Sequence, residues 1–327
     1  MQIALLSNPD SGRSKYLDKI RKLADSDHQI KHFLAADSEQ FARFVEELKH
    51  TPVDLVVINA GDGTIQALLT LIMLHLPEPP LLAILKGGTT NMTNGDVGIK
   101  GSSVSGLKRI MQWNNRQDKR IQTRIRPVLK IQWNDPCSPI CGMFFGAGAI
   151  IEGQDYFHSH LRKKGLRNSI GPALSAIRIL FALNRNQQTL FSPVSMQISG
   201  WEDKHALESS GEPVIQSSGS HLVALASGLE RLFLGIHPFW GNNQGAWHFT
   251  AAQHQPAGYS LLRLLPLFRG KAASDVAQNQ GFISAKLDHL EMHLNGEFTV
   301  DGERYATRAD SPLITISVAG YARFLQL

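Results

Sequence analysis

A glycine-rich turn is the first part of the chain whose residue types could do chemistry. The apolar run Val53–Ile58 leads into Ala60-Gly61-Asp62-Gly63-Thr64, and a helical pattern follows over Ile65–Leu74. Glycines let a backbone approach a phosphate group closely or adopt a positive φ, and Thr64 offers a hydroxyl and a helix cap. The free amides at the start of a helix attract anions. The segment therefore predicts a phosphate site, although a tight strand-to-helix turn with a cap would read the same.

A second turn of the same kind follows the next apolar run. Leu81–Leu85 leads into Lys86-Gly87-Gly88-Thr89-Thr90-Asn91. If the two runs are neighbouring parallel strands, both turns lie at one edge of the sheet, where the ligands of such sheets bind. The two turns could then hold one polyphosphate from two sides. The pair of turns predicts this site more strongly than either turn alone.

Short apolar runs alternate with helical patterns in the first part of the chain. The runs expected to be strands are Ile3–Leu6, Ile30–Leu34, Val53–Ile58 and Leu81–Leu85. Between the second and third runs, residues 38–49 have apolar residues at helical spacing, and Asp37 with Gln40 resembles a capping box. Strands that alternate with helices of this length form right-handed βαβ units. We therefore expect an N-terminal α/β domain, residues 1–124, with a parallel sheet.

The pattern changes after about residue 123 to strand-like runs separated by glycine, proline, asparagine and serine. The runs are Arg126–Trp133, Gly142–Ile150, Leu222–Ala226, Leu290–Leu294 and Leu313–Val318. Such runs are typical of antiparallel sheets. Helical patterns near residues 172–183 and 259–268 interrupt them. We expect residues 125–327 to form a mostly antiparallel β domain, whose last segment could return to the first domain.

Composition and charge limit the function classes. The 327 residues exceed the usual size of one hydrophobic core, and no apolar stretch is long enough for a membrane-spanning helix. The first residues lack the basic flank of a signal peptide, and Cys137 and Cys141 are spaced for neither a redox pair nor a zinc site. A cytoplasmic protein with reduced thiols is expected. The net charge of +5 favours anionic partners, but no stripe of basic and aromatic residues predicts nucleic-acid binding.

Four motifs together resemble the catalytic family of diacylglycerol kinases, sphingosine kinases and their bacterial lipid-kinase relatives. The family opens with Asn-Pro-x-Ser-Gly after its first strand, and its nucleotide loop is Gly-Gly-Asp-Gly-Thr. A Gly-Thr-x-Asn turn and an Asp-Gly-Glu near the C-terminus follow. The matching residues here are Asn8, Pro9, Ser11 and Gly12; Ala60 to Thr64; Gly88, Thr89 and Asn91; and Asp301, Gly302 and Glu303.

This resemblance implies a fold and an activity. The fold would be an α/β nucleotide domain and a β-sandwich domain with the active site in the cleft between them. The activity would be transfer of the ATP γ-phosphoryl group to a lipid hydroxyl with Mg²⁺. The resemblance makes Glu303 the base that accepts the hydroxyl proton, with Asp62 orienting metal or nucleotide, and Glu297 is a competing candidate. The nucleotide would contact Asn8, Ser11, Ala60, Gly61, Asp62, Gly63, Thr64, Gly88, Thr89 and Asn91.

Three departures from the family pattern keep other functions open. Ala60 replaces the first glycine of the nucleotide loop, Met92 replaces an acidic residue, and Gln244 replaces a carboxylate in the segment that serves magnesium. The metal ligands are therefore left unassigned. One alternative is a non-catalytic member that binds nucleotide or lipid. Another is an enzyme similar to NAD kinases, in which the loop aspartate, here Asp62, is favoured as the base.

Two basic and apolar segments could dock on an anionic membrane. They are Leu161–Arg167, with Arg162, Lys163, Lys164 and Arg167, and Leu261–Lys271. Covering helices of the β domain would have the same pattern, but a lipid substrate favours the membrane. We expect peripheral association with an anionic surface. The sequence leaves the lipid acceptor, and whether the protein forms a homodimer, undecided.

Overall fold

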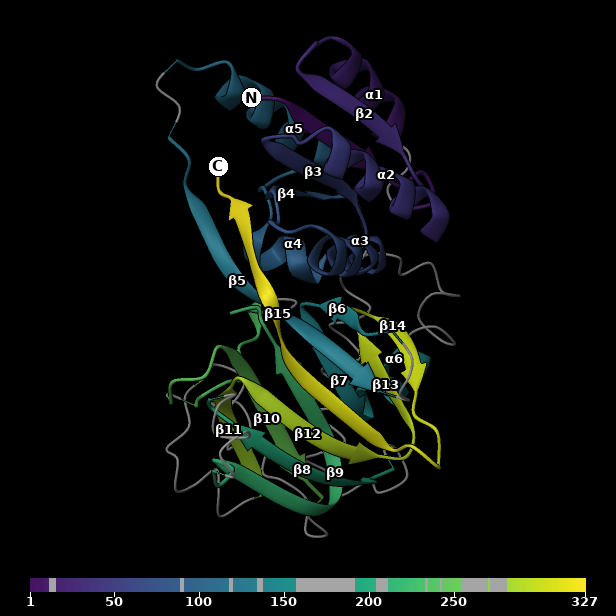
Figure 1. Cartoon of the computed structure of the whole chain (residues 1–327), viewed down its shortest axis with the longest axis vertical. Helices are drawn as coiled ribbons and strands as arrows, with labels where there is room; N and C mark the ends of the chain where they lie inside the picture. Colours follow the sequence, from purple (N-terminus) through teal and green to yellow (C-terminus); the bar gives the residue numbers. More distant parts are fainter. Residues whose placement is uncertain are drawn as a thin grey trace. The chain divides into compact units, whose positions relative to one another are not determined.

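The computed structural model contains two compact units. They comprise Met1–Val128 with Ala319–Leu327, and Leu129–Val318 (Figure 1). The residues that the structure describes are 1–11, 16–88, 91–117, 120–133, 138–156, 192–203, 211–232, 235–241, 243–254, 270 and 281–327. The helical patterns near 172–183 and 259–268, and the basic segments 161–167 and 261–271 apart from Gly270, lie outside these residues. Among the described helices, none is long and apolar enough to cross a membrane.

The first unit is built on a parallel sheet. Its strands are β1 (Ile3–Ser7), β2 (Ile30–Leu34), β3 (Leu55–Ala60) and β4 (Leu81–Lys86), in the order β2-β1-β3-β4. The register pairs Ser7 with Asn59, and Ala60 with Lys86. The carboxyl ends of β1, β3 and β4 therefore lie along one edge, as the positions of the two glycine turns require.

The helices of this unit follow its strands. They are α1 (Leu17–Asp25), α2 (Ser38–His50), α3 (Asp62–His75), α4 (Met92–Val97) and α5 (Ser103–Asn114). The prediction for α2 is confirmed. Asp37 caps it by accepting a hydrogen bond from the Gln40 amide at 2.8 Å. The helix buries Phe41, Phe44, Val45 and Leu48, which are the residues at helical spacing.

Alternation along the strands fixes which helices cover each face of the sheet. Ile3, Leu5 and Val57 point to one face and form a buried cluster with apolar residues of α1 and α5. Residues between them, such as Ala4 and Ile58, point to the other face and are also buried. A sheet buried on both faces explains why these strands are apolar throughout.

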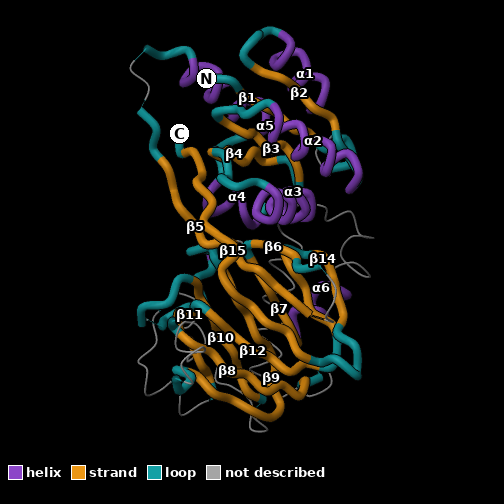
Figure 2. Tube along the Cα trace, viewed as in Figure 1, coloured by secondary structure: helices purple, strands orange, loops and turns teal. Residues whose placement is uncertain are grey.

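The described part of the second unit consists mainly of strands, whereas α1–α5 belong to the first unit (Figure 2). The chain enters it through β5 (Thr123–Trp133) and leaves through β15 (Leu313–Leu325). The other elements are β6 (Ile140–Gly142), β7 (Phe144–Gly148), α6 (Ala149–Tyr156), β8 (Val194–Trp201), β9 (Ile215–Ser227), β10 (Trp247–Gln253), β11 (Phe282–Leu287), β12 (His289–Leu294), β13 (Glu297–Val300) and β14 (Glu303–Ala306).

The sheet of the second unit is antiparallel. One path runs β14-β13-β7-β9-β8-β12-β15, while β10 pairs with β9 and β11, and β5 pairs with β6 and β15. Large side chains such as Trp247, Phe145 and Phe298 fill its core. The predicted class, a parallel α/β sheet followed by mostly antiparallel strands, is confirmed. One expected strand is wrong in detail, because residues 140–150 form β6, β7 and the start of α6.

Candidate functional site

The first glycine turn is shorter than the sequence indicates. β3 ends at Ala60, Gly61 is the N-cap of α3, and the helix begins at Asp62, three residues before the predicted start. Asp62, Gly63 and Thr64 therefore form the first helical turn, and their amides have no acceptor within the helix. Ala60 is buried in the sheet. The anion-attracting groups of this turn are thus the amides at the start of α3.

Backbone contact joins the second glycine turn to the first. A Cβ atom on Gly87 would lie 2.5 Å from the Ala60 nitrogen, and one on Gly88 would lie 2.6 Å from the Gly61 Cα. Real side chains do not approach so closely, so both positions need glycine. A Cβ atom on Gly61 would meet its nearest neighbour at an ordinary 3.5 Å. Gly87 and Gly88 therefore serve the packing of the two turns against each other.

The carboxylate of Asp62 also connects the two turns. It accepts hydrogen bonds from the amides of Met92 (3.1 Å) and Thr93 (3.2 Å), which are the first amides of α4. Burial raises the pKa of Asp62 above its ordinary value, while the amides of Met92, Thr93 and Asn91 oppose this rise. Asn91, the N-cap residue of α4, makes no side-chain cap hydrogen bond. The side chain of Asp62, from α3, caps α4 instead.

The side chain of Asn91 makes two hydrogen bonds with the backbone of Gly88. Asn91 has a left-handed backbone, with φ 52°, and its side-chain Oδ1 accepts a hydrogen bond from the Gly88 amide at 3.0 Å. Its Nδ2 donates to the Gly88 carbonyl oxygen at 2.6 Å. Because Asn91 is buried, these bonds hold it to Gly88 away from solvent. Thr89, the expected phosphate contact, lies outside the described residues.

A third turn, after β1, joins the other two. Asn8 donates from Nδ2 to the hydroxyl of Thr64 at 2.8 Å, and the Gly61 amide donates to the hydroxyl of Ser11 at 3.2 Å. Gly12 lies outside the described residues. The structure thus brings together Asn8, Ser11, Gly61 and Thr64, which are four residues from two predicted motifs separated by about fifty positions.

Sequence reasoning missed a polar group beneath these turns. The hydroxyl of Ser7 accepts a hydrogen bond from Asn59 Nδ2 at 3.2 Å and lies 3.0 Å from His32 Nε2. Burial and the nearby Arg21 lower the pKa of His32, and Asp25 opposes this. Single polar residues inside otherwise apolar strand sequences were the available signal, because such residues need buried partners.

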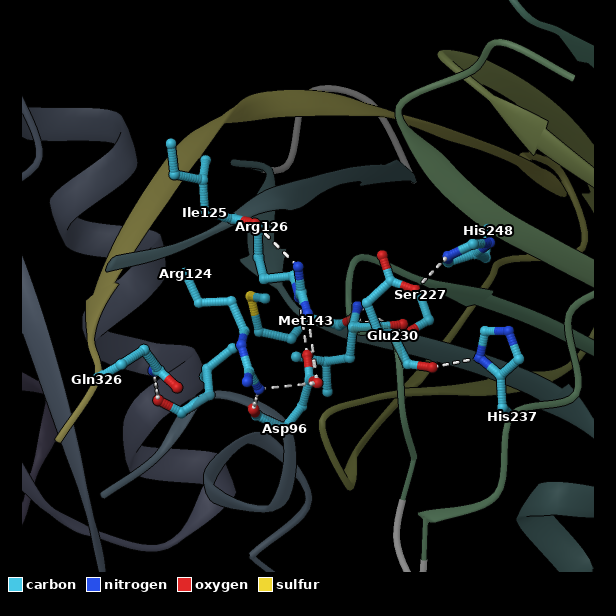
Figure 3. A network of polar contacts seen from close by, with 12 residues as sticks. Asp96, Arg124, Ile125, Arg126, Met143, Ser227, Glu230, His237, His248 and Gln326 are labelled. Carbon is cyan, nitrogen blue, oxygen red and sulfur yellow. Dashed lines mark hydrogen bonds and ion pairs between the residues drawn. The ribbon is translucent and has the colours of Figure 1, made fainter. Parts of the chain in front are cut away.

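A second missed group holds the other end of α4 (Figure 3). The buried carboxylate of Asp96 accepts hydrogen bonds from Arg126 Nε at 2.8 Å and from its Nη2 at 3.4 Å, and Arg124 lies beside it. Gln326 donates to the carbonyl oxygen of Val97 at 2.9 Å. These partners come from β5 and the C-terminal residues, so no local motif reveals them. They fix α4, and with it the second turn.

Glu303 lies in the second unit, at a hairpin between β13 and β14. Asp301 and Gly302 form its two-residue turn with φ 49° and 98°, and Val300 pairs with Glu303. The Asp301 carboxylate is buried and accepts a hydrogen bond from the Met143 amide at 2.8 Å. Glu303 is exposed. The Asp-Gly-Glu motif thus presents a solvent-facing glutamate on an anchored turn.

Contacts with α6 hold this hairpin from the side. Gln154 Nε2 donates to the hydroxyl of Thr299 at 3.1 Å, and that hydroxyl donates to the carbonyl oxygen of Glu303 at 2.9 Å. Arg304 pairs with Asp155 at 2.7 Å and also lies 3.8 Å from the carboxylate of Glu297. The competing candidate Glu297 therefore has a cationic neighbour across the hairpin.

The segment around Gln244 has a structural role. Asn243 donates to the carbonyl oxygen of Lys286 and accepts from its amide at 2.8 Å. A Cβ atom on Gly241 or Gly245 would collide with the β11 backbone. Among the described residues, no group of three His, Cys, Asp or Glu side chains could hold a metal ion. The segment therefore gives no metal site on the described residues alone.

A known protein family matches the part of the chain that contains the three turns. Residues 2–122 match the family described as diacylglycerol kinase catalytic domain. The match covers most of the first unit, including all three turns. The resemblance that the motifs indicated is confirmed over these residues. The sequence matches no curated protein.

Solved structures show that the fold extends over both units. One is a diacylglycerol kinase from Bacillus anthracis strain Sterne, 14% identical, with a TM-score of 0.57 and coverage of 99% of this chain and 96% of that one. Another, a candidate diacylglycerol kinase from the same strain, is 17% identical, with a TM-score of 0.63 and the same coverage. At these identities the likeness shows the fold alone. The chain therefore shares the fold of these structures over both units.

Proposed function

We propose that this protein is an ATP-dependent lipid kinase that transfers the γ-phosphoryl group of ATP to a lipid hydroxyl. The observation that carries the proposal is the junction of three turns at one edge of the parallel sheet. The Asn8–Thr64 bond, the Gly88–Gly61 contact and the bonds from Asp62 to α4 hold the turns together. Their arrangement leaves the first amides of α3 for the phosphates.

The residues present fit a nucleotide polyphosphate. Phosphoryl transfer depends on positioned donors more than on covalent help from the protein. The amides of Asp62, Gly63 and Thr64 and the hydroxyl of Ser11 are such donors, and Thr89 would add another from the second turn. Mg²⁺ would neutralise charge on the phosphates, and it often binds through one or two carboxylates and the phosphates themselves. Asp62 is the carboxylate at these turns that could contribute.

Glu303 is the proposed base. Its role is to accept the proton of the attacking lipid hydroxyl while that oxygen forms a bond to the γ-phosphorus and the bond to the leaving ADP breaks. The anchoring of its hairpin by Asp301 and Gln154 supports this role, because a base must be held at a fixed position. Glu297 is the weaker candidate because Arg304 lies beside its carboxylate.

The acceptor is proposed to be a diacylglycerol- or sphingoid-like lipid. The family match over residues 2–122 supports a lipid kinase, and the solved structures of similar fold carry the name diacylglycerol kinase. Phosphorylation of such a lipid would place the protein in phospholipid metabolism.

One observation favours a second candidate, a non-catalytic protein that binds nucleotide or lipid. Both oxygens of Asp62 already accept backbone hydrogen bonds, so this carboxylate is committed to α4. Ala60 and Gln244 also depart from the family pattern. An enzyme similar to NAD kinases is the third candidate, and it requires Asp62 as base.

Transfer of radiolabel from γ-labelled ATP to fractionated lipids tests the proposal. The expected result is a metal-dependent, labelled phospholipid from one lipid fraction and no label in NAD. Label in NAD would assign the protein to the third candidate. Binding of ATP without transfer to any lipid fraction or to NAD would support the non-catalytic reading and overturn the kinase.

A further inference from the structure

Three large apolar side chains of the first unit are exposed near β5 and β15. Ile121 is 55% exposed, Ile125 53% and Tyr321 55%, and they are half of the six exposed large hydrophobic residues among the described ones. Tyr321 alternates along β15 with buried Ala322, and exposed Arg323 follows. Successive strand residues point to opposite faces, so Tyr321 and Arg323 share the outward face.

Hydrogen bonds fix the backbone under these side chains. β5 pairs with β15, and the amide of Gln326 donates to the carbonyl oxygen of Gln122 at 2.9 Å. Trp113 Nε1 of α5 donates to the carbonyl oxygen of Arg120 at 3.0 Å. Ile125 belongs to β5, and its carbonyl oxygen accepts a hydrogen bond from Arg126 Nη1 at 3.1 Å (Figure 3). The exposed residues therefore belong to an ordered surface of the first unit.

The sequence that leads into β5 is rich in basic residues. Residues 97–128 contain eight lysines and arginines and one acidic residue, Asp118. The basic residues are Lys100, Lys108, Arg109, Arg116, Lys119, Arg120, Arg124 and Arg126. Arg126 and Arg124 neutralise the buried Asp96, whereas Arg120 and Arg323 are exposed. The surface is both basic and apolar.

We propose that this surface, formed by Arg120, Ile121, Ile125, Tyr321 and Arg323, docks the protein on an anionic lipid bilayer. Isoleucine side chains enter the apolar boundary of a bilayer, and tyrosine is favoured at its interface. Arginine side chains place their charge among anionic headgroups. The surface is distinct from the basic segment 161–167, and its binding to lipid needs no kinase activity.

A second copy of the chain and a single-stranded nucleic acid both fit this surface less well than a bilayer does. In a symmetric dimer the same patch meets itself, so Arg120 and Arg323 would face like charges. Binding to single-stranded nucleic acid uses aromatic side chains on which successive bases stack, and Tyr321 is the one exposed aromatic residue in this surface. An anionic bilayer matches both the apolar and the basic residues.

Co-sedimentation with vesicles tests the proposal without ATP. One set of vesicles is phosphatidylcholine, and the other is an equimolar mixture of phosphatidylcholine and phosphatidylglycerol. We expect binding to the mixed vesicles only, weakened by salt. The double variant Arg120→Gln/Arg323→Gln should lower the partition coefficient about thirtyfold, because each basic residue contributes about 1 kcal/mol. The matched control Arg21→Gln/Arg43→Gln, on α1 and α2, should bind like the wild type.

Hydrogen–deuterium exchange of the wild type gives a readout that does not depend on variants. Mixed vesicles should protect amides in 120–128 and 319–325. Protection confined to 157–191, or equal binding of the two double variants, would overturn the proposal. A concentration-dependent dimer that Ile125→Ser abolishes would instead assign the surface to a second copy. Binding to single-stranded DNA in place of vesicles, weakened by Arg120→Gln/Arg323→Gln, would assign it to nucleic acid.

Discussion

The carboxylate of Asp62 accepts a hydrogen bond from the backbone amide of Met92, a residue thirty positions further along the chain. Asp62 begins α3 and Met92 begins α4, so one side chain joins the starts of both helices at the carboxyl edge of the sheet. Met92 stands where the family has an acidic residue. Its side chain is not needed for this contact, because the bond uses its backbone amide.

The pH dependence of stability should report the environment of Asp62. Its pKa is raised in the folded protein above the ordinary value of 3.8, so the folded state retains this proton to higher pH than the unfolded state. Its contribution to stability is therefore fully present below the unfolded pKa and is lost as pH rises through the folded pKa. Asp62→Asn cannot titrate.

Urea denaturation of the wild type and Asp62→Asn at several pH values measures this effect. The free energy of unfolding of the wild type, relative to the variant, should increase as the pH falls from neutral toward about 4. A constant difference, or one that changes in the opposite direction, would show that burial does not dominate the pKa of Asp62.

The contact between the two glycine turns predicts a difference between Gly88→Ala and Gly61→Ala. A Cβ atom at Gly88 meets the Gly61 backbone at 2.6 Å, whereas one at Gly61 finds an ordinary contact at 3.5 Å. Gly88→Ala should cost about 1–3 kcal/mol in the free energy of unfolding, as overpacking does, and Gly61→Ala should cost less than about 1 kcal/mol. Equal costs in denaturation experiments would contradict the close packing of the turns.

Cys141 should resist alkylation in the folded protein. Burial raises the pKa of its thiol to about 12, so at pH 8 only about one thiol in ten thousand is a thiolate. Peptide mapping after treatment with iodoacetamide should find Cys141 unmodified in native protein and modified after unfolding. Rapid labelling of Cys141 in the native protein would show that this strand region opens readily.

Kinetics should separate the two glutamates of the β13–β14 hairpin. Glu303→Gln keeps the shape and removes the basicity, so kcat should fall by about 10²- to 10⁴-fold while ATP affinity changes little. Glu297→Gln, on the same hairpin, should have a much smaller effect. The reverse order would make Glu297 the base. If neither matters and Asp62→Asn abolishes turnover, the mechanism is that of the enzymes similar to NAD kinases.

Local patterns predicted the four strands of the parallel sheet, α2 and most of α3, because each of these signals lies within one segment. Helical spacing and the Asp37 cap define α2, and the two glycine turns follow their strands. The start of α3 was placed late because glycine and aspartate are poor helix formers, although aspartate suits a first turn. In the second unit, β8 and β13 alternate polar and apolar residues, so a strand signal was present and was missed, and β13 is only four residues long.

Contacts between distant segments could not be predicted in the same way. The sequence marks Gly87 and Gly88 as glycines of a turn, but it does not show that Ala60 and Gly61 lie against them. The pairing of Asp96 with Arg126 joins α4 to β5 through the fold alone. The roles of Asp62 and Asn91 as caps and turn braces likewise appear only when α3 and α4 are placed side by side.

Calorimetric titration with ATP tests the central claim that the start of α3 binds nucleotide phosphates. The wild type should bind ATP and bind AMP more weakly, because AMP lacks the β- and γ-phosphates. Gly63→Val puts a branched side chain at the first turn of α3, so it should abolish ATP binding while leaving the melting temperature nearly unchanged. Wild-type protein that does not bind ATP, or a folded Gly63→Val variant that binds it as tightly as the wild type, would contradict the account.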